Sequence, residues 1–224
     1  MLSTPKKQDR NCTISYILER LNTLDLTQLI PFFADLPIDP YLEGNYRFRR
    51  LSHFRISDRR VVQLPHIAMF QSKTHNPLLG NVVREYAELD PELIKCPDFQ
   101  ALILEFFEFC QRCSPSDEVG VHQIRITADQ GVGNPAPEGI HRDGVDIIGI
   151  VCVNRDGVAG GETHLYESKD RSPVFTKVLN PGELLVVNDQ QLFHFTTPIH
   201  ARSPGAGVRD VFVFTCPGLS ASSR

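Results

Sequence analysis

The chain has 224 residues, of which 41% are hydrophobic and 22% are charged, values that are ordinary for a globular protein with a sizeable core. Its formal net charge of −4 argues against broad electrostatic attraction to nucleic acid or to an anionic membrane. No run of about 18 apolar residues is present, as a transmembrane helix would require, and residues 1–10 lack the apolar segment of a secretory signal. We therefore expect a cytoplasmic protein, folded as a single domain over residues 1–224, with residues 1–10 disordered.

The six cysteines are spread along the chain, unlike the dense framework of a small secreted disulfide protein. Cys110 and Cys113 form a lone CxxC motif, without a second pair to complete a zinc site and without the βαβ context of a redox motif. We interpret the cysteines as reduced structural residues.

The first portion of the chain, residues 11–115, begins with a helical pattern. Apolar residues recur at helical spacing over residues 13–29 and predict a helix that Thr13 could cap. Arginines and apolar residues then alternate in parts of residues 41–56, which predicts a strand, with a second strand near residues 60–69. We expect the arginines here to form ion pairs or to contribute to the entrance of a site.

Two further helices are expected in this portion. One covers residues 82–87, after the Asn76–Pro77 turn. The other covers residues 97–112 and ends before Pro115, because the residue before a proline disfavours helix. The longer helix carries a wide apolar stripe, made by Phe99, Leu102, Ile103, Phe106, Phe107 and Cys110.

The second portion, residues 116–217, consists of short strand patterns separated by glycine and proline turns. Many short strands with this punctuation indicate a sandwich or barrel of the jelly-roll type. With helices ahead of it, the fold class is α+β, a cupin-like β core with N-terminal helices packed on it. The expected strands are residues 119–127, 145–153, 162–166, 174–179, 183–187, 192–198 and 209–216.

His141, Asp143 and His194 make up a candidate metal site. Residues i and i+2 of a strand point to one face, so His141 and Asp143 can converge on one ion at the start of the strand over residues 145–153. His194 alternates with two phenylalanines, which favours an imidazole that points into a cavity. Two histidines and one carboxylate are the facial triad that binds Fe(II) and leaves positions open. A histidine and an aspartate at this spacing also arise by chance among eight histidines.

An iron oxygenase that uses 2-oxoglutarate also needs a cation for the distal carboxylate of this cosubstrate. Arginine suits this role because its planar guanidinium pairs with both carboxylate oxygens. Arg209 opens the last predicted strand, and a hairpin between neighbouring strands would bring it near His194. Arg202, in a loop, is a second candidate.

Several motifs together resemble the bacterial 2-oxoglutarate/Fe(II)-dependent dioxygenases that hydroxylate free L-amino acids, the isoleucine dioxygenase group in particular. The resemblance covers about residues 41–217 and implies a double-stranded β-helix core that uses Fe(II), 2-oxoglutarate and O2 and releases succinate and CO2. It leaves the accepted substrate open. The motifs are GIHRDG at 139–144, GGET at 160–163, PGE at 181–183, LFH at 192–194, YRFRRLS at 46–52 and NPL at 76–78.

The strand before the metal motif supplies further candidates. Alternation places Gln123, Arg125 and Thr127 on one face, and the opposite face, with Ile124 and Ile126, is expected to be core. We expect Gln123 to contact the cosubstrate and Arg125 to bind a substrate carboxylate.

Other substrate contacts are less defined by the sequence. Thr163, in the GGET motif, is a further substrate-binding candidate. The ammonium group of an amino acid could be bound by Asp129, Glu138 or Asp146, which the sequence does not separate.

Other functions compete with amino-acid hydroxylation. The same oxygenase chemistry could act on another small metabolite or on a peptide side chain. A non-catalytic, cupin-like module for a metal or ligand, or a zinc hydrolase with the same three ligands, is also compatible with the triad. The expected partner is a small-molecule substrate, without nucleic acid or membrane. The sequence permits a homodimer but leaves the oligomeric state open.

Overall fold

The computed structural model describes residues 14–129, 131–203, 205 and 207–219. The predicted disorder of residues 1–10 and the predicted cap at Thr13 lie outside these residues. The described elements are β1 (Tyr16–Arg20), the 3-10 helix η1 (Leu26–Phe33), β2 (Arg47–Ser57), β3 (Arg60–Gln63), α1 (Pro91–Lys95), α2 (Pro97–Cys113), β4 (Glu118–Thr127), β5 (Val132–Gly133), β6 (Ile147–Asp156), β7 (Val158–Gly160), β8 (Glu162–Tyr166), β9 (Phe175–Val178), β10 (Glu183–Asn188), β11 (Phe193–Thr196), β12 (Ile199–Ala201) and β13 (Val208–Cys216).

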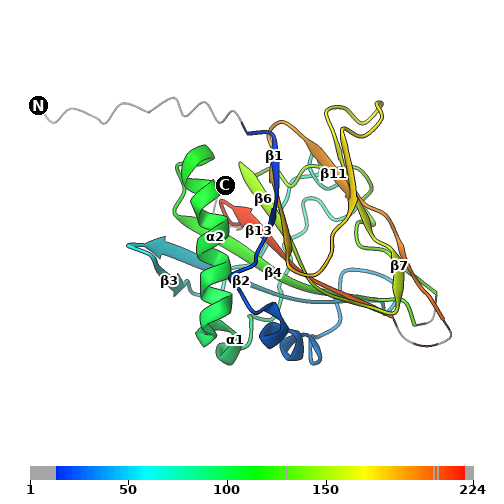
Figure 1. Ribbon diagram of the computed structural model, residues 1–224. Helices are drawn as coiled ribbons and strands as arrows, with labels where there is room; N and C mark the ends of the chain where they lie inside the picture. The colour runs from blue at the N-terminus through cyan, green and yellow to red at the C-terminus, as the bar shows by residue number, and fades with distance from the viewer. Residues whose placement is uncertain (1–13, 130, 204, 206, 220–224) are drawn as a thin grey trace, which may run out of the picture.

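The strands form one large antiparallel sheet and two small ones. The large sheet has the order β1-β10-β6-β13-β4-β2-β3, and the small sheets have the orders β11-β8-β9 and β5-β12-β7. Figure 1 shows α2 against one face of the large sheet and β11 and β7 on the side away from α2. This arrangement confirms the predicted α+β jelly-roll class. The N-terminal strands β1, β2 and β3 belong to the large sheet, so the β core is not confined to residues 116–217.

The outer face of the large sheet packs against α2, whose apolar stripe is buried as predicted. Phe212 and Phe214 of β13 project to this face, where Phe212 contacts Phe99 with ring centroids 5.3 Å apart and Phe106 stacks on Phe214. Pro97 stands in the first turn of α2, a position where its missing N–H costs no helical hydrogen bond. This apolar layer covers one face of the large sheet.

The inner face of the large sheet lines a cavity. Because side chains alternate along a strand, the neighbours of the outward phenylalanines, Val211 and Val213, point inward with Arg209. On β4 the inward residues are Ile124 and Ile126, together with His122. The predicted assignment of the two β4 faces was therefore reversed, because the face next to α2 is the apolar core and carries Gln123.

The predicted helix over residues 13–29 is wrong. Tyr16–Arg20 instead forms β1, an edge strand paired with β10 from Tyr16↔Val187 to Arg20↔Glu183. Asp25 then accepts a hydrogen bond from the Thr27 backbone and opens η1. Pairing with an available sheet edge satisfies the backbone and overrides local helical periodicity.

The predicted helix over residues 82–87 is also wrong. This segment is extended, and Arg84 exchanges backbone hydrogen bonds with Met69 while the Ala87 carbonyl accepts from Leu51. The strand predicted near residues 60–69 is shorter than expected and ends at Gln63. Here too, backbone hydrogen bonds to distant segments outweigh the local preference for a helix.

Two composition-based expectations can be compared with the structure. Within the described residues, no helix combines the length and the apolar character needed to span a bilayer. Cys96, Cys110, Cys152 and Cys216 are free thiols, whereas Cys113 is disulfide-bonded. The interpretation of all cysteines as reduced is therefore wrong at Cys113.

Candidate metal centre

The two histidines of the predicted triad lie side by side on paired backbone segments. His194 is on β11, and its N–H donates to the His141 carbonyl at 2.8 Å while the His141 N–H donates back at 3.1 Å. This isolated bridge joins the loop before β6 to the small sheet. The two imidazole centroids are 4.2 Å apart, and both rings are buried. Backbone pairing thus brings together residues more than fifty positions apart in the chain.

His141 is oriented by a backbone carbonyl. Its Nδ1 lies 2.9 Å from the Gly139 oxygen, so Nδ1 donates to this carbonyl and Nε2 faces Glu138 and Asp143. Burial lowers the pKa of His141, but the carboxylates of Glu138 and Asp143 and the Gly139 contact act in the other direction, and the net pKa is raised. Glu138 Oε1 lies 3.1 Å from His141 Nε2. The cavity-facing nitrogen of His141 is thus in a strongly negative environment.

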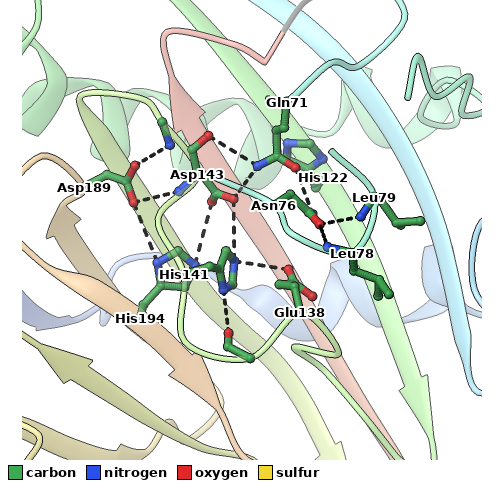
Figure 2. A network of polar contacts seen from close by, with 12 residues as sticks. Gln71, Asn76, Leu78, Leu79, His122, Glu138, His141, Asp143, Asp189 and His194 are labelled. Carbon is green, nitrogen blue, oxygen red and sulfur yellow. Dashed lines mark hydrogen bonds and ion pairs between the residues drawn. The ribbon is translucent and has the colours of Figure 1, made fainter. Parts of the chain in front are cut away.

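His194 is held neutral by its surroundings. Burial, followed by the nearby His141, lowers the pKa of His194 well below its ordinary value. Its Nδ1 lies 3.7 Å from Asp189 Oδ1, which leaves Nε2 facing Asp143 (Figure 2). A neutral imidazole with a free lone pair is the form that binds a metal ion.

Asp143 sits in a tight turn that a buried aspartate stabilises. Gly144 has φ +85°, and a Cβ there would lie 2.6 Å from the His75 ring, so the turn requires glycine. The Asp189 carboxylate accepts the backbone N–H groups of Asp143, Gly144 and Val145 at 3.1, 2.7 and 3.1 Å. Burial and then the charge of Asp143 raise the pKa of Asp189 to about 7, against these three backbone hydrogen bonds.

A carboxamide fixes the Asp143 side chain. Gln71 Nε2 donates to Asp143 Oδ1 at 2.8 Å, and Gln71 Oε1 accepts from Asn76 at 3.3 Å (Figure 2). The same Oε1 also accepts from Arg84 at 2.6 Å. Because Oε1 is occupied by two donors, the amide must direct its nitrogen toward Asp143. This hydrogen bond orients the Asp143 carboxylate and uses one lone pair of its Oδ1.

The distances suit a first-row metal ion. His141 Nε2 is 3.7 Å from Asp143 Oδ1, and His194 Nε2 is 3.8 Å from Asp143 Oδ2. One donor atom from each residue lies within 4.8 Å of the others. Two donors about 2.0–2.2 Å from one ion lie at most about 4.4 Å apart, so small side-chain adjustments complete such a site. Two imidazoles and one carboxylate fit the donor set that selects Fe(II).

Arg209 presents an unsatisfied cation to the same cavity. It is 3% exposed, and its Nε and Nη2 have no hydrogen-bond partner among the described residues. Burial lowers the pKa of Arg209 to about 10, a direction that follows from desolvation of its charge. The predicted hairpin is wrong, since β13 lies in the large sheet and β11 in a small one. Arg209 and His194 instead line the cavity from different sheets.

Three other predicted contacts do not reach the cavity. Gln123 donates to the Phe32 carbonyl at 2.9 Å on the outer face. Arg125 forms a bidentate ion pair with Asp210, at 2.7 and 2.9 Å. Thr163 is buried against Thr196, 3.3 Å away, and Thr196 rather than Thr163 lines the cavity. These residues have structural contacts, and the reversed alternation of β4 accounts for Gln123 and Arg125.

The three candidates for an ammonium contact are separated by the fold. Glu138 lines the cavity. Asp146 accepts from Ser114 and Gln190 away from it, and Asp129 is an exposed residue outside the cavity lining. Arg202 is likewise exposed and absent from the lining.

Known proteins share this architecture and sequence. The family model of the 2OG-Fe dioxygenases matches residues 30–215 of the chain. The chain belongs to the 2OG-Fe dioxygenase family. This dioxygenase is therefore an enzyme that uses Fe(II), 2-oxoglutarate and O2, as predicted. Membership of this family does not support the non-catalytic module or the zinc hydrolase.

Two curated relatives align with most of this dioxygenase. A 3(1)-hydroxy-L-isoleucine 4-dioxygenase from Pantoea ananatis (strain AJ13355) is 28% identical over 204 residues, covering 85% of this chain and 80% of the relative. An L-isoleucine-4-hydroxylase from Bacillus thuringiensis is 26% identical over 213 residues, covering 89% and 86%. These relatives confirm the predicted resemblance to the isoleucine dioxygenase group.

Solved structures agree with the fold. The crystal structure of a bsmA homologue from Methylobium petroleophilum PM1 has a TM-score of 0.75 and 32% identity, covering 84% of this chain and 79% of that one. The structure of IDO from Bacillus thuringiensis has a TM-score of 0.76 at 20% identity, covering 90% and 92%, and supports the fold alone.

Several residues of the site were not singled out by the sequence analysis. Gln71, Arg84 and Asp189 meet the triad only through contacts between distant segments. One sequence pattern did point to this region of the site: arginines alternate with other residues before residue 50. The structure places two of these arginines, Arg47 and Arg49, in the cavity lining.

Proposed function

We propose that this dioxygenase hydroxylates a free L-amino acid or a small amino-acid derivative, with release of succinate and CO2. The observation that carries the proposal is the convergence of His141, Asp143 and His194 at a cavity that also contains the unpaired Arg209. The names of the two curated relatives support an amino-acid substrate.

In this proposal His141, Asp143 and His194 hold Fe(II) through two imidazole nitrogens and one carboxylate oxygen. Arg209 pairs with the distal carboxylate of 2-oxoglutarate, which would satisfy its buried guanidinium. When bound, Fe(II) and 2-oxoglutarate supply the O2-dependent oxidation of a substrate C–H bond. The protein orients the cosubstrate and the substrate and excludes water from the reacting atoms.

The cavity favours a small substrate with an apolar side chain. Much of its lining is aliphatic, which would desolvate a hydrocarbon side chain. Glu138 is the one candidate for the substrate ammonium group that faces the cavity. The aliphatic residues include Leu79, Ile124, Ile150, Val211, Val213 and Leu219.

A panel assay tests the substrate class. Succinate release and O2 uptake are measured for the twenty L-amino acids, their common N-substituted forms and a set of short peptides. We expect stimulation by aliphatic amino acids or their derivatives, strictly dependent on 2-oxoglutarate. If only peptides or non-amino-acid metabolites stimulated succinate release, the alternative substrate classes would replace this proposal.

Ligand substitutions test the metal assignment. His141→Ala or His194→Ala removes one of three ligands, so Fe(II) affinity and substrate-stimulated succinate formation should each fall by more than about 100-fold. His200→Ala, at an exposed position on β12, serves as the control and should keep normal turnover. Full turnover in either ligand variant would refute the assignment.

A cytoplasmic location and the absence of nucleic-acid and membrane partners stay predictions of the sequence. The same holds for a homodimer. Cell fractionation and the solution mass of the purified enzyme would test them.

A further inference from the structure

Two arginines of the cavity, Arg49 and Arg84, are buried without a carboxylate partner in the described part of the chain. They are 6% and 1% exposed. Arg49 contacts the neutral acceptor His122 Nδ1 at 2.5 Å, and Arg84 donates to Gln71 Oε1 at 2.6 Å. The Nε–H of each guanidinium has no hydrogen-bond partner among the residues that the structure describes. Both side chains therefore keep donors available for an anion.

Other arginines of the same fold show how it neutralises a structural cation. Arg47, also in the cavity lining, is paired with the buried Asp39 at 2.7 Å. Arg125 is paired with the buried Asp210. A buried unpaired charge is strongly unfavourable, and Arg49 and Arg84, like Arg209, are cations whose counter-ion the described residues do not supply.

Arg49 and Arg84 line the same cavity and come from neighbouring segments of the chain. Arg49 lies over the Tyr86 ring, 4.3 Å from its centroid, and contacts the Met69 sulfur at 3.4 Å. Met69 pairs through its backbone with Arg84. Tyr86 is two residues after Arg84 in an extended segment, so their side chains point to one side. One anionic group could thus contact both arginines.

This pair is separate from the Arg209 position. In the large sheet Arg49 pairs with Ile124, and Arg209 pairs with Ile126 from the other side of β4. Two strand spacings and two residues of rise correspond to about 12 Å between the backbone positions. The cavity therefore carries buried guanidinium groups at two separate positions, and a carboxylate group at one of them would not occupy the other.

The pair is also linked to the metal centre. Arg84 contacts Gln71, and the same carboxamide contacts Asp143. Between Arg84 and Asp143 there is therefore a single side chain, that of Gln71.

We propose that Arg49 and Arg84 form a clamp for the carboxylate of the organic substrate, while Arg209 serves 2-oxoglutarate. The inference rests on the proposed function and narrows its substrate to molecules with a free carboxylate beside an apolar side chain. Guanidinium groups on two segments fix the position of the carboxylate, and hence which carbon of the side chain faces the metal.

The test compares an acid with its amide. Anaerobic titration calorimetry on the enzyme loaded with Fe(II) and 2-oxoglutarate measures Kd for L-isoleucine, or for a better amino acid from the panel, and for the matching primary carboxamide. Wild-type enzyme should bind the acid at least about 100-fold more tightly. In Arg84→Met and in Arg49→Met this ratio should fall below about 10-fold. Arg50→Met, on the same strand but bonded to the Glu88 carbonyl, should keep the wild-type ratio.

The outcomes separate the two proposals. Equal affinity of wild-type enzyme for acid and amide overturns the clamp and leaves amino-acid hydroxylation standing, as does an unchanged ratio in both variants. Absence of amino-acid binding and turnover in wild-type enzyme overturns both proposals. The wild-type comparison requires no substitution, so it can overturn the clamp even if a variant fails to fold.

Discussion

Asp189 shapes the metal centre without belonging to the predicted ligand set. Its carboxylate is fully buried and accepts three consecutive backbone N–H groups from the turn that carries Asp143. The same carboxylate faces His194 Nδ1. One side chain therefore positions two ligand candidates that come from different segments, as the outer partners of metal ligands commonly do.

Replacement of Asp189 should weaken metal binding. An asparagine keeps the size but offers one acceptor oxygen in place of two, so part of the backbone network is lost. We expect Asp189→Asn to lower Fe(II) affinity by about 10- to 100-fold, measured by anaerobic titration. Asp117→Asn, at an exposed position, provides the control. An Fe(II) affinity equal to that of wild type would show that Asp189 does not position the ligands.

At the scale of elements, the two faces of β13 have different roles, one in the stability of the core and the other in the lining of the cavity. Its outward residues belong to the apolar core beneath α2, whereas its inward residues line the cavity. Phe212 is fully buried and contacts Phe33 and Phe99, with centroids 5.1 and 5.3 Å away. Val213, the next residue, faces the substrate space. Alternation along one strand thus assigns adjacent residues to different tasks.

Substitutions on the two faces should have different effects. Phe212→Ala leaves a cavity in the core and should lower the free energy of unfolding by about 3–5 kcal/mol, as measured by urea denaturation. Val213→Ala should change the amino-acid KM more than the unfolding midpoint. A loss below about 1 kcal/mol in Phe212→Ala would contradict the packing described for this face.

At the scale of the whole molecule, two buried histidines connect stability to pH. His53 and His122 are 3% and 2% exposed. Burial lowers the pKa of both, and the nearby Arg49 lowers that of His122 further. In the unfolded chain each has its ordinary value near 6.5. At a pH between the folded and unfolded pKa values of a histidine, the unfolded state binds a proton that the folded state does not. The free energy of unfolding should therefore decrease as pH falls below about 6.5.

A variant isolates one of these groups. Each such histidine contributes a slope of up to about 1.4 kcal/mol per pH unit in that window. His53→Gln should therefore make the decrease in unfolding free energy between pH 6 and pH 5 shallower by up to this amount, as measured by urea denaturation across pH. The exposed His200→Gln is the control. Parallel profiles for His53→Gln and wild type would contradict this assignment.

The sequence indicated most of the second half correctly. The strands near residues 119–127, 162–166 and 209–216 and the helix over residues 97–112 appear close to the predicted bounds, because period-2 and helical stripes there match the face that is buried. The N-terminal helix prediction failed because β1 completes its hydrogen bonds with β10, far away in the chain. The assignments of Gln123 and Arg125 failed because alternation does not reveal which face meets the helix.

The amino-acid sequence alone determined the fold class, the family resemblance and the three metal-ligand candidates, because strand periodicity and the His141, Asp143 and His194 pattern are local or carry a recognisable spacing. Only the tertiary structure decided which face of β4 borders the cavity and which arginines lack a carboxylate. Those properties depend on distant segments: among the described residues Arg84 meets the carboxamide of Gln71 and no carboxylate, whereas Arg125 meets the carboxylate of Asp210. Desolvation and long-range contact, rather than residue type, make one arginine structural and leave another available for a ligand.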